Sequence, residues 1–270
     1  MRSFRDRVDG LGTSASGYND VMPEVLAGAK NRTSARPPDW KRGTIALLLF
    51  GISFGYVEAS VVIYLNALYE PLRQRIYPGR TSSNVFPLLP LEELKAAGPQ
   101  YIRLLKVELA RESATLGMLA AAALLVSRSG AQWLAAFLIA FGAWDLSFYA
   151  FLKLLLHWPD SWLTWDLLFL IPVPWAAPVL APVLVSVTMI GGGLMYFTKE
   201  WMRRPVHLGW PHWFGFFACG LILVVAFTWD FRNISAGGMP RSFPWPVFAF
   251  AEAIGLGTFL HAVSSSSRGC

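Results

Sequence analysis

Charged residues are scarce in this chain of 270 residues: Asp, Glu, Lys and Arg make up 15% of it, against about 25% in soluble domains. Hydrophobic residues account for 54%, and no charged residue occurs from Leu167 to Thr198. This composition argues against a soluble globular domain. Long apolar stretches separated by short polar ones are typical of a multi-pass membrane protein.

Cysteine is almost absent, and the motifs of common cofactor sites are missing. Cys219 lies inside an apolar stretch and Cys270 is the last residue, so a disulfide between them is not expected. There is no CxxC pair, no His-Glu-x-x-His and no Glu-x-x-His, which argues against zinc and di-iron sites. P-loop and GxGxxG motifs are missing too, and no basic stripe interleaved with aromatics suggests nucleic-acid binding. The sequence assigns no cofactor and no metal.

Positive charge is concentrated near the beginning of the chain. The net charge is +6, and the first 42 residues contribute half of it, with eight basic and five acidic residues. Residues 1–39 are therefore predicted to form a flexible basic cytoplasmic tail near anionic lipid. They contain no apolar stretch of the kind found in signal peptides, so the first hydrophobic span is expected to direct membrane insertion.

The hydrophobic pattern predicts an all-α membrane protein with about six transmembrane helices. Residues 40–263 form one polytopic membrane domain, and 264–270 form a short cytoplasmic tail. A short surface helix is expected at 91–97, within the longest loop. The predicted spans are 43–68, 106–127, 131–156, 178–198, 210–229 and 246–263.

Four prolines interrupt the segment before the fourth span. Pro172, Pro174, Pro178 and Pro182 fall within eleven residues, and each removes a backbone donor and clashes one helical turn back. Residues 167–177 are therefore predicted to be a non-helical or re-entrant piece at the outer rim of a pocket. Such backbone at membrane depth has to be shielded by protein or line a wet cavity.

Basic residues predict the orientation. The N-terminal tail, Arg128, the 199–204 cluster and Arg268 would all face the cytoplasm. Arginines in the first outer loop count against this arrangement, and the basic tail and the 199–204 cluster outweigh them only in part. We predict an inner-membrane protein with both termini cytoplasmic, and reporter fusions that placed residues 1 and 270 on opposite sides would contradict it.

Three acids lie at similar depth in three different spans. Glu58 is 15 residues after Gly43, Glu112 is 15 residues before Ser127, and Asp145 is 15 residues after Gly130. Fifteen helical residues rise roughly 22 Å, which leaves each acid roughly 8 Å below the outer surface of a core about 30 Å thick. A charge at that depth usually faces a partner, a cavity or a ligand.

Further polar residues extend this group. Glu108, Arg111 and Glu112 share one helix face by their spacing, and Tyr149 lies one turn after Asp145. With Glu58 they place four acids against one arginine, so some acids are protonated, or a cation or water lies among them. The simpler interpretation is an interhelical salt bridge with two acids at the wet interface.

Two other acids are open to simpler interpretations. Asp166 is expected to be a solvated loop acid or a helix cap, with a place at the pocket rim as the alternative. Glu252, inside the last span, is expected to be protonated and bonded to a neighbour rather than catalytic. If it faces the bundle, Glu252 could instead continue a proton path.

Three functions are compatible with these features. The leading one is an acidic pocket, open to the outer face, that binds a cation or a polar lipid headgroup, or a non-catalytic subunit that binds partner subunits of a membrane complex. The second is a membrane enzyme acting on a lipid-linked or periplasmic substrate, with Glu108, Glu112 or Asp145 as base and Arg111 holding an anionic group. The third is a proton- or cation-coupled transporter, which the broken segment favours and the missing internal repeat does not.

Overall fold

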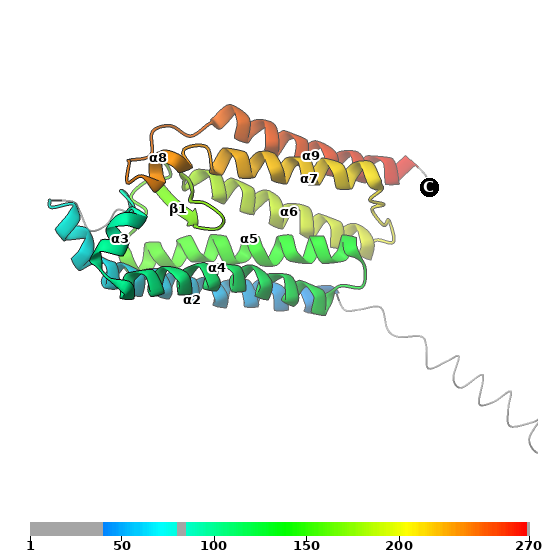
Figure 1. The fold of residues 1–270 in the computed structure, drawn as a ribbon. Coiled ribbons are helices and arrows are strands. Elements are labelled where there is room, and N and C mark those ends of the chain that lie inside the picture. The colour runs from blue at the N-terminus through cyan, green and yellow to red at the C-terminus, as the bar shows by residue number, and fades with distance from the viewer. Residues whose placement is uncertain (1–39, 80–84, 269–270) are drawn as a thin grey trace, which may run out of the picture. The chain divides into compact units, whose positions relative to one another are not determined.

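A computed structural model describes residues 40–79 and 85–268 (Figure 1). The predicted tail at 1–39 lies outside the described residues, so its flexibility stays a prediction. The same holds for residues 80–84 of the first long loop and for 269–270.

The described chain is mostly helical, as predicted, and six of its helices are long and apolar enough to cross a membrane. These are α2, α4, α5, α6, α7 and α9, while α3 and α8 are short. Their orientation and the identity of the membrane stay predictions. The elements are α2 Trp40–Ile76, α3 Leu91–Ala97, α4 Pro99–Val126, α5 Gly130–Leu156, β1 Trp165–Phe169, β2 Trp175–Pro178, α6 Leu180–Trp201, α7 Trp210–Phe227, α8 Phe231–Ser235 and α9 Trp245–Arg268.

Two helices, α2 and α4, extend further than predicted, both at the end of the bundle where α3 lies. The first continues through Pro71 to Ile76 instead of ending at Leu68. Proline inside a helix costs about 3 kcal/mol, but Leu72 and Arg73 beyond it are buried, and their packing supports the extension. Similarly, α4 begins at Pro99 rather than at Lys106, because proline suits the first turn of a helix.

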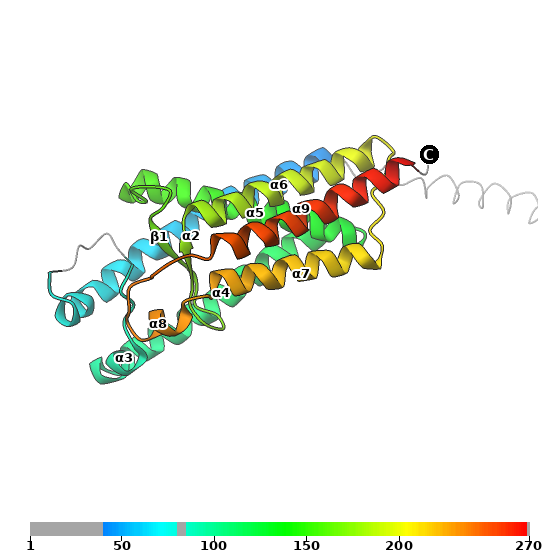
Figure 2. The same cartoon turned by 90° about the horizontal axis from the view of Figure 1, so that it is seen from above.

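The helix α5 lies at the centre of the bundle. In its most apolar window 56% of the residues are buried, against 11–33% in the other five spans. Figure 1 shows α2 and α4 on one side of α5 and α6 on the other, with α7 and α9 side by side beyond α6. In Figure 2, as in Figure 1, α3, α8 and the strands gather at one end of the helices.

The proline-rich segment forms an antiparallel β-hairpin, so the all-α prediction is wrong in this detail. Asp166 pairs with Ala177 across the two strands. Near its tip, the ring of Phe169 lies 6.2 Å from that of Trp144 on α5, and Trp175 stacks 6.3 Å from Phe227 on α7. The hairpin is non-helical, as predicted, and pairing between its strands satisfies some of its backbone polar groups, which need partners inside a bundle. Re-entry into a membrane stays a prediction.

Close packing of α2 on α5 depends on two small positions. At Gly51, a Cβ atom would lie 2.7 Å from Ala143 Cβ and 2.8 Å from the carbonyl oxygen of Ala140. At Gly55, it would lie 2.8 Å from the carbonyl oxygen of Trp144. Backbone atoms cannot move aside cheaply, so these glycines set the distance between the helices.

Gly51→Ala should therefore destabilise the protein by about 1–3 kcal/mol through overpacking. Thermal unfolding in mild detergent would measure the loss. Gly117→Ala on α4 is the matched control, since a Cβ there meets nothing within 4 Å. Equal unfolding temperatures for the two variants would contradict the proposed packing.

Candidate functional site

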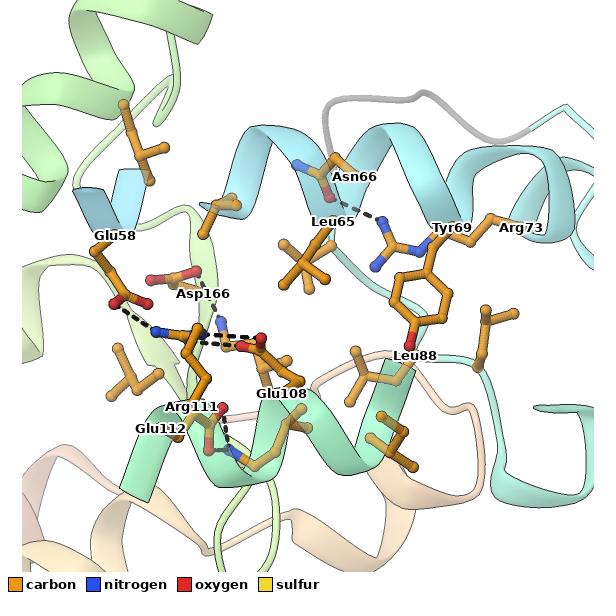
Figure 3. Close-up of a pocket in the computed structure, with 18 of the residues that line it drawn as sticks. Glu58, Leu65, Asn66, Tyr69, Arg73, Leu88, Glu108, Arg111, Glu112 and Asp166 are labelled. Carbon is orange, nitrogen blue, oxygen red and sulfur yellow. Dashed lines mark hydrogen bonds and ion pairs between the residues drawn. The ribbon is translucent and has the colours of Figure 1, made fainter. Parts of the chain in front are cut away.

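A partly enclosed cavity of about 430 Å³ lies at the end of the bundle where the hairpin packs (Figure 3). Side chains from α2, α3, α4, α5, the hairpin and the loops before α3 and β1 line it. Most of the wall is apolar and rich in leucine. The polar side chains in the wall are Glu58, Asn66, Tyr69, Arg73, Glu108, Arg111, Glu112 and Asp166.

The guanidinium of Arg111 joins two carboxylates in this cavity. Its Nε and Nη2 atoms donate to the two oxygens of Glu108 at 2.9 and 2.5 Å, one turn earlier on α4. Its Nη1 atom donates to Glu58 Oε2 on α2 at 2.6 Å. The side chain of Glu58 is 10% exposed and that of Arg111 is 25% exposed. The contact is therefore a largely buried ion pair between two candidate spans.

The next acid on α4 holds the hairpin in place. Both oxygens of Glu112 accept the backbone N–H of Leu170, at 3.0 and 2.9 Å. Leu170 directly follows β1, where the ladder to β2 has ended. A buried N–H without a partner is costly, so Glu112 supplies the acceptor that the turn of the hairpin needs.

Asp166 on β1 is buried at the cavity wall, which corrects the expectation of a solvated loop acid. Its Oδ2 atom accepts the hydroxyl of Tyr149 at 2.8 Å, and its Oδ1 atom accepts the N–H of Leu167 at 2.8 Å. The pKa of Asp166 is raised to about 7, chiefly by burial and slightly by the nearby Asp145, while the two hydrogen bonds oppose the rise. This carboxyl can therefore exchange a proton near neutral pH.

Asp145 lies behind the cavity rather than beside Arg111, which corrects the expectation drawn from matched depth. Its Oδ2 atom accepts the hydroxyl of Ser186 on α6 at 2.8 Å, and both residues are buried. Depth along a helix axis does not fix the direction of a side chain, and Asp145 faces α6. Tyr149, one turn later, reaches the site through Asp166.

Three polar wall residues escaped the sequence interpretation. Asn66, Tyr69 and Arg73 follow Glu58 on the same face of α2, and Arg73 Nη1 donates to Asn66 Oδ1 at 3.1 Å. Their spacing of three and four residues was a usable signal. Only Asn66 lies within the predicted span, because Tyr69 and Arg73 come after its predicted end at Leu68.

The cavity carries an excess of acid. Four carboxyl groups and two guanidinium groups are in its wall, which leaves a formal charge of −2 if every group is ionised. The part of the chain that the structure describes contains no group of three or more His, Cys, Asp and Glu side chains placed to hold a metal ion. No family model, curated protein or solved structure matches this chain.

Arg111→Ala should destabilise the protein more than Glu58→Gln does. Removing the guanidinium leaves Glu58 and Glu108 close together and unpaired, a cost of about 3–5 kcal/mol for a buried pair. Glu58→Gln keeps a hydrogen-bond acceptor and lowers the acid excess. Thermal unfolding in detergent would compare the variants, with Arg103→Ala on the exposed face of α4 as the control. The opposite ranking would contradict the role of Arg111.

Stability should also fall with rising pH because of Asp166. Its pKa is about 7 in the folded protein and about 4 in an unfolded chain, so folding takes up a proton between these values. The stabilisation is complete below about pH 4 and is lost as the pH rises through 7. From pH 5.5 to pH 8, the wild type should lose about 2 kcal/mol relative to Asp166→Asn.

Asparagine at this position still offers an oxygen to the Tyr149 hydroxyl, so the comparison isolates the effect of Asp166 protonation on stability. Asp160→Asn, at an exposed loop position, is the matched control and should follow the wild type. Parallel stability–pH curves for the wild type and Asp166→Asn would show that Asp166 is already ionised across this range.

Proposed function

We propose that this cavity binds the polar headgroup of an amphiphile, whose apolar chain lies along the leucine walls. The observation that carries the proposal is the combination of a charged cluster and an apolar wall in one cavity, within a bundle long and apolar enough to cross a membrane. Its volume falls within the range of about 300–1,000 Å³ of small-molecule sites. The leucines of the wall are Leu65, Leu88, Leu89, Leu94, Leu105, Leu152, Leu156, Leu167, Leu168 and Leu170.

The acid excess selects the charge of the headgroup. Arg111 is already shared by Glu58 and Glu108, and the N–H that binds Glu112 carries no net charge. A cationic group on the ligand would balance the charge of Glu112 and form short, charge-assisted hydrogen bonds with its carboxylate. The proposed ligand is therefore an amphiphile with a protonated amine, such as an aminated lipid headgroup.

The proposal includes an inner-membrane location, with both termini cytoplasmic and the cavity open to the outer face. Membrane lipid is then both the surroundings and the source of the ligand. Headgroup binding is also compatible with a role as a non-catalytic subunit of a membrane complex, because binding a headgroup requires no chemical step.

One observation favours a second candidate, a headgroup-modifying enzyme. Asp166 has a pKa of about 7 and lies in the same cavity as the Arg111 cluster. A base of that pKa is suited to proton transfer at neutral pH. In such an enzyme, Asp166→Asn would lose turnover while the amphiphile stays bound.

The direct test is native mass spectrometry of protein released from bilayers containing equal amounts of phosphatidylethanolamine and phosphatidylglycerol. The wild type should retain the amine-bearing lipid in preference. Glu112→Gln should lose about tenfold in retention, the cost of one charge-assisted hydrogen bond. Glu93→Gln, an exposed acid on α3, is the matched control and should behave as the wild type does.

Preferential retention of the anionic lipid would overturn the proposal, as would equal retention by Glu112→Gln and the wild type. Copurifying proteins in the same spectra would identify a subunit role, since a subunit would be released from the bilayer in complex with its partners.

A further inference from the structure

A second cavity, of about 310 Å³, lies in the other half of the bundle and shares no lining residue with the first. Side chains of α5, α6, α7 and α9 form its wall, with Leu208 from the loop before α7. All four helices belong to the six candidate spans. The cavity therefore lies among apolar helices, and its chemistry has to be explained separately from the first site.

One carboxyl group stands in this apolar wall. Of the described residues that line the cavity, Glu252 on α9 is the only charged one, and none is basic. Its Oε2 atom accepts the hydroxyl of Thr188 on α6 at 3.0 Å. A neutral hydroxyl satisfies part of the carboxyl group but supplies no counter-charge. Inside a membrane such an acid needs a proton or a cation.

The room beside Glu252 comes from glycines. Gly192 and Gly220 line the cavity, and a Cβ atom at either position would meet nothing within 4 Å. Aromatic side chains complete the wall, namely those of Tyr196, Phe216 and Phe259. Aromatic rings pack well against apolar and aromatic groups of a ligand.

We propose that this cavity binds a hydrophobic organic cation, in which apolar substituents surround a single positive charge. Glu252 supplies the counter-charge, and the apolar and aromatic wall takes the substituents. A lipid acyl chain would use only the apolar wall and would gain nothing from the carboxylate. An anion would meet Glu252 with no basic residue nearby to offset the repulsion.

Two probes of the same shape and opposite charge, tetraphenylphosphonium and tetraphenylborate, separate these cases. Binding is measured by equilibrium dialysis on the full chain in nanodiscs of zwitterionic lipid, with empty nanodiscs subtracted. The wild type should show saturable binding of tetraphenylphosphonium and none of tetraphenylborate. Glu252→Gln, which keeps an acceptor for Thr188, should bind the cation at least about tenfold more weakly.

Gly220→Leu should abolish binding by filling the cavity without a clash at Cβ. Gly257→Leu is the matched control, because its Cβ position is also open but it does not line the cavity. The proposal is overturned if tetraphenylborate binds as well as tetraphenylphosphonium, if Glu252→Gln binds as the wild type does, or if the wild type shows no saturable binding. None of these variants touches the first cavity, so this test and that of the headgroup site can fail independently.

Discussion

A guanidinium inside an apolar bundle costs free energy unless acids surround it, and Arg111 meets this condition with Glu58 from α2 and Glu108 from its own helix. The ion pair to Glu58 links α4 to α2, although α4 packs more extensively on α5 than on α2. One turn along from Glu108, Glu112 reaches the hairpin at Leu170. The helix α4 therefore carries the arginine and two of the four acids in the cavity and contacts a third, Glu58.

The hairpin depends on the same helix. Residues with this many prolines cannot form a continuous span, and their backbone groups need partners inside the bundle. The β1–β2 ladder satisfies some of them, and Glu112 satisfies the N–H of Leu170, where the ladder has ended. Asp166 on β1 then reaches Tyr149 on α5. The ionic cluster on α4 and the acid on the hairpin are thus held in one cavity by backbone requirements.

Local patterns in the sequence predicted a large part of this arrangement. The length of the apolar stretches predicted the six candidate spans, and the spacing of the prolines predicted the non-helical segment. The spacing of three residues placed Glu108 and Arg111 on one helix face. What the sequence could not predict depends on rotation and on long-range pairing. Asp145 accepts a hydrogen bond from Ser186 on another helix, and the partner of Glu112 lies 58 residues away in the turn of a hairpin whose strand pairing has no local signature. The continuation of α2 beyond Pro71 depends on burial of Leu72, which is a tertiary effect.

Buried carboxylates cost free energy in both cavities, and the protein offsets this cost differently in each. In the first, Arg111 offsets two of the acids within the protein, so any one carboxylate contributes part of the field that a ligand meets. In the second, Glu252 has a hydroxyl partner and no basic neighbour in the cavity wall. The charge of the proposed ligand there would be balanced by one residue. Under these proposals, loss of a single acid would weaken selectivity for charge in the first cavity and remove it in the second.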